Sequence, residues 1–411
     1  MIFNNLSIQN WNQFRDVEIS LHPKITIITG ANGAGKSTIL RLFSRLVGWG
    51  FNELSTPIKG KMNKGFKYRI SRRLKLEEDV DAHQQISIGN ITLKNGQILN
   101  INAPLNTDQA IYGISINPHP SLKGINIPSH RTAYTYRQIT SIPVKAHTRN
   151  EAYNMFNSSV MQRTLGQYSD PPIYQMKASL ISLAVFGKGN EYATSDSEAL
   201  ELFLGFIEIL KKLLPPTLGF ETLNIRSGEV VLVTKSGEFL LDSVSGGIGA
   251  ILDLAWQIYM FEAGKDEPFF VIIDEAENHL HASMQRQLLP SLIDSFPNAQ
   301  FIVSTHSPLM VNSVKESFVY VLKYNDERTV DSYLLDFENK AGNAAQILRD
   351  VLGVPITMPI WVEEDLNNIL DKYRGNELTP ESYLSLKNDL SALGLADHLP
   401  QALGFLQGGN R

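Results

Sequence analysis

The chain has 411 residues, of which 43% are hydrophobic and 19% are charged, and its 37 basic and 42 acidic side chains leave a formal net charge of −5. This composition can bury a sizeable core, which excludes disordered and fibrous proteins, and the length fits two or three ordinary domains or one large α/β domain with insertions. The net charge excludes a protein that is basic throughout, but it leaves room for a local basic patch that could contact nucleic acid.

The sequence contains no cysteine, which excludes disulfides, thiolate metal sites and cysteine nucleophiles. Met1 leads directly into a strand-like segment, without the basic and apolar regions of a leader peptide. The apolar runs Ala178–Phe186 and Phe203–Leu214 are shorter than the roughly 20 residues that a membrane-spanning helix needs. We therefore expect a soluble, cytoplasmic protein that makes no contact with a membrane.

The N-terminal third predicts strands around one helix. Residues 2–29 predict two strands and a turn, and the second strand, Lys24–Thr29, has the β-branched pattern of strands buried in a parallel or mixed sheet. A helix is expected from Lys36 to Gly48. Residues 50–130 predict short strands and loops, with Asn95-Gly96 as the turn of a hairpin.

The middle of the chain is predicted to be mostly helical over residues 148–214. Ser195–Glu198 has the pattern of a capping box, which would begin a helix that ends before Pro215. Residues 229–241 predict a second hairpin, with its turn at Ser236-Gly237.

The last third predicts alternating helices and strands. A helix over 249–262 leads to a strand over 269–273, and a helix over 284–296 leads to a strand over 301–304. Strand, helix and strand in this order are typical of a parallel sheet. From about Ala341 onward the chain predicts a short helix, a turn at Val354-Pro355 and a helical hairpin, without a phosphate-binding motif.

One segment matches the phosphate-binding loop of P-loop proteins. Gly30-Ala-Asn-Gly-Ala-Gly35-Lys36-Ser37 lies between a predicted strand and a predicted helix, where such a loop must lie. The glycines allow backbone N–H groups to surround phosphate oxygens, Lys36 would reach the β- and γ-phosphates, and Ser37 would ligate Mg²⁺. The nucleotide-binding candidates are Asn32, Gly33, Ala34, Gly35, Lys36, Ser37 and Thr38.

Two acidic residues follow the hydrophobic strand Phe269–Ile273. Asp274 is placed to hold Mg²⁺ beside Ser37, and Glu275 to activate water in line with the γ-phosphate. His306 ends the next strand, and we expect it to lie on the neighbouring strand within reach of the γ-phosphate as a donor.

Together these motifs resemble those of ABC-type ATPases, in the soluble branch that includes RecF, SMC and OLD proteins. Gly30–Thr38 resembles the Walker A loop, Ser245-Gly246-Gly247 the signature motif, Asp274-Glu275 the Walker B motif with its catalytic glutamate, and His306 the switch histidine. Leu280-His281 with Gln285 resembles the D-loop stretch of OLD-like proteins. The sequence departs from the usual motifs of these proteins at Ile248, Ala276 and Ala282, and none of these changes removes a group that touches phosphate.

The resemblance implies an α/β fold, namely an ABC-type ATPase head with a mixed sheet and P-loop core, a strand- and helix-containing insertion, and a helical C-terminal tail. The expected parts are 1–50 and 241–330 for the head, 51–240 for the insertion, and 331–411 for the tail. It also implies ATP hydrolysis with ATP and Mg²⁺ as cofactors. In the family a further residue from the insertion contacts the nucleotide site; Gln138 is the candidate here, and Arg131, in Pro128-Ser-His-Arg131, is its rival.

The signature motif implies a second copy of the chain. In the family, signature residues complete the ATP site of a partner head, so that two heads enclose two nucleotides. The resemblance therefore implies a homodimer or higher homo-oligomer in which ATP closes the heads and hydrolysis by Glu275 reopens them.

Two further segments leave alternatives open. Lys and Arg residues between Lys59 and Lys75 alternate with Phe66 and Tyr68, which suits contact with DNA or simply a solvated strand face. The tail resembles those of ATPases in prokaryotic defence systems of the Septu, retron and PARIS types, and would assemble subunits, hold an effector or pack on its own head. The expected function is a regulatory ATPase of antiviral defence that controls a separate nuclease or toxin. A RecF-like DNA-repair ATPase is the alternative, and a transporter subunit is a remote one.

Overall fold

The computed structural model describes residues 1–59, 66–71, 85–104, 109–131, 134–262, 267–336, 342, 344–352, 360–374, 379–396 and 399–407. The chain forms two compact units, residues 1–347 and residues 348–411. No helix in the described ranges has the length and apolar character needed to cross a membrane.

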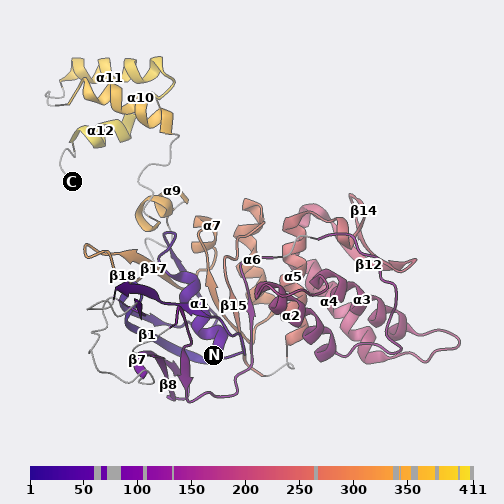
Figure 1. The fold of residues 1–411 in the computed structure, drawn as a ribbon. Helices are drawn as coiled ribbons and strands as arrows, with labels where there is room; N and C mark the ends of the chain where they lie inside the picture. Colours follow the sequence, from indigo (N-terminus) through magenta and orange to yellow (C-terminus); the bar gives the residue numbers. More distant parts are fainter. Residues whose placement is uncertain are drawn as a thin grey trace. The chain divides into compact units, whose positions relative to one another are not determined.

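The larger unit is built on a sheet of 11 strands (Figure 1). In spatial order the strands are β10 (Ser115–Asn117), β8 (Ile98–Pro104), β7 (Gln85–Leu93), β1 (Phe3–Trp11), β2 (Phe14–Ser20), β18 (Val330–Leu334), β17 (Phe318–Tyr324), β3 (Ile25–Gly30), β16 (Ala299–Ser304), β15 (Phe269–Ile273) and β11 (Gly124–Ile127). Strands β17, β3, β16, β15 and β11 are parallel, while β10, β8, β7, β1 and β2 form an antiparallel half. This mixed sheet confirms the predicted α/β fold.

The parallel half explains why β3 reads as a continuous β-branched run. All six of its residues are buried, because β16 and β17 flank it and helices cover the sheet. Strand β2 instead alternates buried and exposed residues, as expected when only one face of a strand packs on the core.

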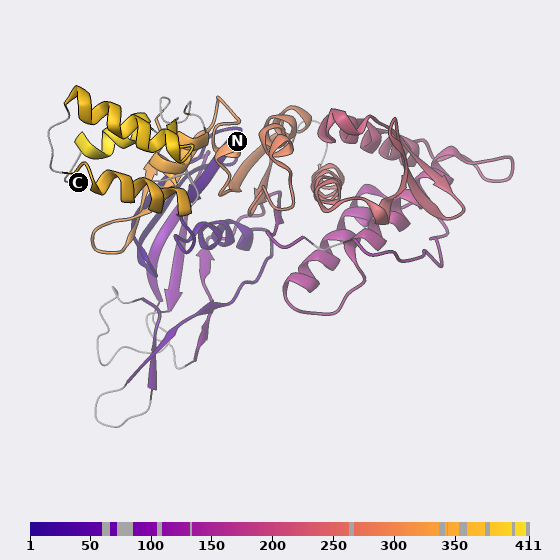
Figure 2. The same cartoon turned by 90° about the horizontal axis from the view of Figure 1, so that it is seen from above.

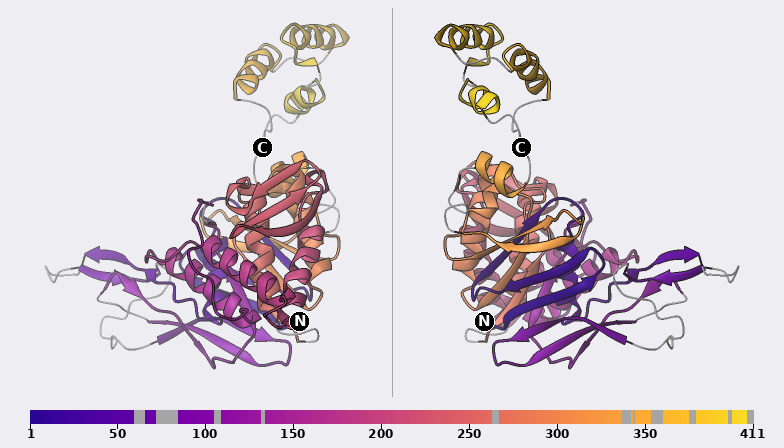
Figure 3. Two further views of the ribbon diagram at one scale, coloured as in Figure 1. Left: turned by 90° about the vertical axis from the view of Figure 1, so that its right-hand side faces the viewer. Right: turned by 90° about the vertical axis from the view of Figure 1, so that its left-hand side faces the viewer.

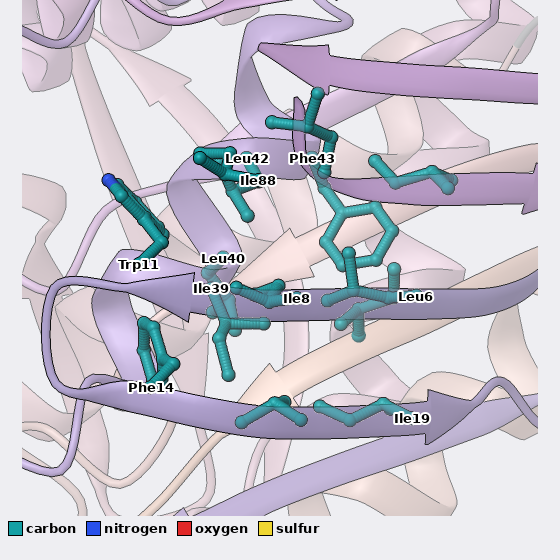
Figure 4. Close-up of a cluster of buried hydrophobic side chains, with 14 of the residues drawn as sticks. Leu6, Ile8, Trp11, Phe14, Ile19, Ile39, Leu40, Leu42, Phe43 and Ile88 are labelled. Atoms are coloured by element: carbon teal, nitrogen blue, oxygen red, sulfur yellow. The ribbon is translucent and has the colours of Figure 1, made fainter. Parts of the chain in front are cut away.

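Helix α1 (Lys36–Arg45) packs across the sheet at the junction of its two halves. Figure 4 shows Ile39, Leu40, Leu42 and Phe43 of this helix among side chains of β1 and β2, such as Leu6, Ile8 and Ile19. The Phe3 ring contacts Phe43 at 5.1 Å and Phe270 at 4.8 Å between centroids. This apolar contact fixes the start of α1 above the carboxyl ends of the parallel strands.

A helical lobe adjoins the parallel edge of the sheet (Figure 2). It contains α2 (Arg149–Thr164), α3 (Pro172–Lys188), α4 (Ser197–Leu213), α5 (Gly246–Phe261) and the strands β12 (Phe220–Arg226), β13 (Glu229–Thr234) and β14 (Gly237–Leu240). Helix α5 contacts α2, α4 and β11, so it joins the lobe to the sheet.

The remaining elements are short or lie on the sheet. They are β4 (Glu53–Leu54), β5 (Thr56–Lys59), β6 (Phe66–Arg69), β9 (Ile111–Tyr112), α6 (Ala282–Ser295), α7 (Pro308–Val311), α9 (Ala344–Gln346), the 3-10 turns Pro216–Leu218 and Leu241–Ser243, and the π-helical turn Ile347–Val351. Most of the basic stretch Lys59–Lys75 lies outside the described residues.

Several predicted elements are confirmed and others are corrected. The hairpins that turn at Asn95-Gly96 and Ser236-Gly237, and the parallel pair β15–β16 around α6, are present. Residues 2–29 contain three strands rather than two, because Asn12 turns the chain with a φ of 50° between β1 and β2. The helix that was predicted to begin at Ser195 is capped by Asp196, whose side chain accepts from the N–H of Ala199.

The described residues of the smaller unit include the helices α10 (Ile360–Asp371), α11 (Pro380–Ala392) and α12 (Leu399–Gln407), drawn in gold and yellow in Figure 3. Their shared core contains Val362, Leu366, Ile369, Leu370, Leu386, Leu390, Leu395 and Ala402. The helical spacing predicted for the tail is thus present, whereas the expected turn at Val354-Pro355 lies outside the described residues.

Candidate functional site

The phosphate-binding loop connects the end of β3 to the first turn of α1. Gly30, Gly33 and Gly35 have φ values of 138°, 79° and 98°, which side chains other than glycine rarely adopt. A Cβ on Gly30 would lie 2.4 Å from the carbonyl oxygen of Leu322, and one on Gly35 would lie 2.4 Å from the Phe14 ring. Close approach of β17 and β2 therefore requires glycine at both ends of the loop.

The other loop residues form the bend between these glycines. Asn32 and Gly33 are exposed at its tip, Ala34 is buried, and Thr38 is half-buried in the first turn of α1. The carbonyl oxygen of Gly33 accepts from Tyr324 Oη at 2.9 Å and from Gln13 Nε2 at 3.3 Å. Strand β17 and the turn between β1 and β2 thus hold the tip of the loop.

Lys36 is buried at the start of α1, with its ammonium group turned into the loop. Nζ donates to the carbonyl oxygens of Gly30 and Ala31, both at 3.0 Å. Burial lowers the pKa of Lys36, and the nearby carboxylates of Asp274 and Glu275 oppose that shift. The geometry places a cation inside a loop of backbone groups, next to two acidic side chains.

Asp274 follows β15, and its carboxylate accepts hydrogen bonds from helix α1 and from the end of strand β16. Ser37 Oγ donates to Asp274 Oδ1 at 3.1 Å, and Ser304 Oγ, at the end of β16, donates to the same oxygen at 2.5 Å. A hydroxyl and a carboxylate side by side are the hard oxygen ligands that Mg²⁺ prefers, and Mg²⁺ commonly takes its other ligands from substrate phosphates and water. The donor set of Ser37 and Asp274 therefore fits Mg²⁺.

Glu275 lies one residue further, in a left-handed backbone conformation with a φ of 48°. Its N–H donates to Ser304 Oγ at 2.8 Å, and its Oε2 accepts from Asn278 Nδ2 at 2.7 Å. A non-glycine residue in this conformation stores strain that the surrounding contacts must hold. The hydrogen bond from Asn278 therefore holds the Glu275 carboxylate in this turn.

His306 follows β16, as the sequence predicts. Its N–H donates to Glu277 Oε1 at 2.5 Å, and the preceding Thr305 donates its N–H to the carbonyl oxygen of Ile28 in β3. Burial, followed by the positive charge of Lys36, lowers the pKa of His306. The ends of β3, β15 and β16 therefore bring Lys36, Asp274, Glu275 and His306 together.

The signature residues lie elsewhere in the same unit. Ser245 and Gly246 are exposed at the start of α5, and within the described residues the Ser245 side chain makes no capping hydrogen bond. A Cβ on Gly247 would lie 2.9 Å from the carbonyl oxygen of His279. Ser245 and Gly246 line a cavity of about 190 Å³ that none of the P-loop residues lines.

Of the two candidates from the insertion, the structure brings Arg131 rather than Gln138 to the acidic residues. Arg131 Nη1 donates to the carbonyl oxygen of Asn278 at 3.0 Å. Gln138 is exposed, and its neighbour Arg137 offers its carbonyl oxygen to Lys177 of α3. Sequence spacing does not show which of the two positions reaches the acidic residues.

Three residues at the site were not among the sequence candidates: Ser304, Glu277 and Asn278. Ser304 precedes Thr305 and His306, and Glu277-Asn278 follow the acidic pair by two positions. Polar residues next to a motif are the signal that could have identified them. Gln285, predicted as part of the D-loop stretch, accepts from Ser307 Oγ at 2.6 Å.

The part of the chain that forms this site matches a known protein family. The chain matches the family described as "AAA domain, putative AbiEii toxin, Type IV TA system" over residues 25–312, which is well over half of its length. The chain belongs to this family. It is an ATPase of the AAA/ABC-like type, and the matched range contains the loop, the acidic pair and His306.

Individual relatives are named as Septu, retron and OLD proteins. The Septu protein PtuA of Bacillus thuringiensis is 20% identical over 383 residues, covering 88% of this chain and 87% of that protein. The "Retron Vc95 probable ATPase" of Vibrio cholerae is 27% identical and covers 43% of this chain and 33% of that protein. The OLD nuclease of Thermus scotoductus is 24% identical and covers 83% of this chain and 66% of its own length. The chain thus spans a third to two thirds of the latter two proteins.

Proposed function

We propose that this ATPase works as a nucleotide-dependent dimer switch, with Glu275 as the general base. The observation that carries the proposal is the convergence of Lys36, Asp274, Glu275 and His306 at the ends of three adjacent strands. Lys36 and the loop N–H groups would hold the phosphates, and Ser37 with Asp274 would hold Mg²⁺, which offsets phosphate charge when bound.

Three side chains would perform the hydrolytic step. Glu275 would accept a proton from the attacking water, because Asn278 orients its carboxylate. Burial disfavours the charged form of Lys36, but two nearby carboxylates favour it, so Lys36 would stay charged beside the transferred phosphate. His306, whose pKa is lowered by burial, would be neutral near pH 7 and able to donate a hydrogen bond.

The exposed signature supports a second copy of the chain as partner. Ser245 is exposed at the start of α5, and the cavity that it lines contains none of the chain's own P-loop residues. A helix start whose serine hydroxyl makes no capping hydrogen bond is suited to donate to phosphate oxygens, and here it would donate to those held by the partner. Each of two sites would then use the P-loop of one protomer and the signature of the other.

Light scattering after size exclusion tests the switch. The Glu275→Gln variant keeps the shape of the side chain but loses the base, so with ATP and Mg²⁺ it should run at twice the monomer mass of 45.9 kDa. Without ATP, or with Lys36→Met added, it should run as a monomer. A mass that does not respond to ATP would refute the switch.

We further propose that the switch controls a separate effector, a nuclease or a toxin, in antiviral defence. Relatives named as Septu and retron proteins support this setting. Tagged Glu275→Gln chain, captured from its native host with ATP, should retain a nuclease or toxin that Lys36→Met does not retain. Recovery of DNA alone would instead favour a repair-type ATPase.

A further inference from the structure

Asn278 is held between the candidate base and the segment that follows β11. Its Nδ2 donates to Glu275 Oε2 at 2.7 Å and to the carbonyl oxygen of Ser129 at 3.1 Å. Both hydrogens of the amide are therefore used, one on each side. The orientation of the Glu275 carboxylate is thus tied to the position of Ser129.

A second contact from the same segment holds the backbone of Asn278. Arg131 Nη1 donates to its carbonyl oxygen, while Nε and Nη2 of Arg131 are buried without a hydrogen-bond partner among the described residues. Burying a guanidinium with two donors that make no hydrogen bond costs free energy, so nearby negative charges must offset that cost. The carboxylates that act on it most strongly are those of Asp253, Glu277 and Glu275.

Arg131 lines one cavity together with Asp253 of helix α5 and with Ser245 and His279. Asp253 therefore links Arg131 to that helix. It is buried in the middle of that helix, and its Oδ1 accepts from Tyr134 Oη at 2.7 Å. Tyr134 Oη also donates to the carbonyl oxygen of Gly249, one turn closer to the helix start. Tyr134 therefore fastens the segment that follows β11 to helix α5.

The start of α5 contacts the same loop directly. Gly247 packs so closely on the carbonyl oxygen of His279 that a Cβ would lie 2.9 Å from it. His279 has a φ of 68° and Glu275 one of 48°, so left-handed residues stand on both sides of Asn278. A loop in this state keeps its shape only while its neighbours hold it.

We propose that Asn278 is a positioning residue for Glu275, and that Arg131 and Asp253 connect it to helix α5, whose first residues form the signature motif. A displacement of the signature end of α5 shifts Arg131 and Asn278 and so changes the direction of the Glu275 carboxylate. The position of the signature motif thereby sets the rate of ATP hydrolysis. This inference rests on the proposed role of Glu275 as base.

Steady-state hydrolysis by the full chain tests the role of Asn278. Asn278→Asp is isosteric but has no donor, and it places a second carboxylate beside Glu275; Asn278→Ala removes the contacts without adding charge. We expect kcat to fall about 100-fold in both variants, the cost of a misplaced catalytic group, with KM nearly unchanged. Asn154→Ala, an exposed amide on α2, is the matched control and should keep wild-type kcat.

A double-mutant cycle tests the connection to α5. Arg131→Met alone should lower kcat, and added to Asn278→Ala it should lower kcat little further, because both changes interrupt one chain of contacts. Fully additive losses of kcat would overturn the inference. A raised KM and a lowered melting temperature without a separate fall in kcat would overturn it as well. If Arg131→Met does not fold, unchanged kcat in Asn278→Asp is enough to overturn it.

Failure of this inference can be told from failure of the proposed function. Glu275→Gln should bind ATP and abolish turnover if Glu275 is the base. Loss of turnover in Glu275→Gln together with wild-type kcat in Asn278→Asp would reject the positioning role alone. Retained turnover in Glu275→Gln would reject both.

Discussion

Ser304 Oγ donates to Asp274 Oδ1 at 2.5 Å and accepts from the N–H of Glu275 at 2.8 Å. One buried hydroxyl from β16 thus fixes both acidic residues that follow β15. Because the two strands are parallel neighbours, Ser304 sets the acidic pair relative to the P-loop strand on its other side. The hydroxyl is a structural part of the site although it lies within a strand.

Replacing Ser304 by alanine should therefore weaken both the fold and the site. A hydrogen bond to a charged group contributes about 1.5–3 kcal/mol, so Ser304→Ala should lower the free energy of unfolding by roughly that amount. Hydrolysis should fall as well, since Asp274 and Glu275 lose a shared support. Urea unfolding and an ATPase assay measure the two effects. Ser87→Ala, an exposed serine on β7, should change neither.

Replacing a P-loop glycine by alanine should cost more stability than the same change at a glycine of positive φ in open space. Gly35 and Gly48 have φ values of 98° and 84°, but a Cβ would lie 2.4 Å from Phe14 at Gly35 and in open space at Gly48. Both Gly→Ala changes carry the left-handed penalty of about 1–2 kcal/mol. Gly35→Ala should therefore lower the melting temperature more than Gly48→Ala, and equal losses would contradict the close packing of β2 on the loop.

Asp253 should make stability depend on pH. Burial raises its pKa from 3.8 to about 7, against the hydrogen bond from Tyr134 and the charge of Arg131. Between these two values the folded chain binds the proton more tightly than the unfolded chain, so this stabilising contribution is lost as pH rises toward 7. Asp253→Asn stays neutral, so its melting temperature relative to wild type should be higher at about pH 8 than at about pH 5. The same difference at both pH values would contradict the raised pKa.

Lys177 ties α3 to the segment that leads into the signature. Its side chain is 0% exposed, and Nζ donates to Asp242 Oδ2 at 2.6 Å and to Glu229 Oε2 at 2.9 Å. Lys177→Met leaves two acidic groups without their cation, and breaking a buried pair in this way costs about 3–5 kcal/mol. Urea unfolding should show that loss.

Lys211 provides the matched control for that change. It pairs with Glu208 one turn away, and both side chains are largely exposed. Surface pairs contribute about 0–1 kcal/mol, so Lys211→Met should leave the unfolding midpoint nearly unchanged. Similar losses in the two variants would show that Lys177 is not a buried anchor.

Motifs that are continuous in sequence could be predicted, because their neighbours lie along the chain. The P-loop between a β-branched strand and a helix, and the acidic pair after a hydrophobic strand, specify their own local structure. The ends of β3, β15 and β16 meet because parallel strands place their carboxyl ends on one edge. The roles assigned to these residues remain proposals.

Contacts that depend on the path of the chain could not be predicted. Asp253 lies in the middle of α5, where Gly249–Met260 are all buried, and its hydrogen bond from Tyr134 comes from a distant segment of the chain. Gln138 and Arg131 are seven positions apart in one segment, yet Arg131 reaches the loop after the acidic pair while Gln138 is exposed. Strands β17 and β18, which follow His306, were not predicted, although β17 supplies the carbonyl oxygen that requires glycine at position 30.

Mixing two inactive variants tests the shared ATP site most directly. Lys36→Met retains its signature but lacks a working P-loop, and Ser245→Arg retains its P-loop but blocks its signature. Each chain alone should fail to hydrolyse ATP. A mixture should recover activity, because a mixed dimer contains one site with the P-loop of the Ser245→Arg chain and the signature of the Lys36→Met chain. No recovery, with both variants folded and mixed dimers present, would contradict the proposal that the signature completes the site of a partner.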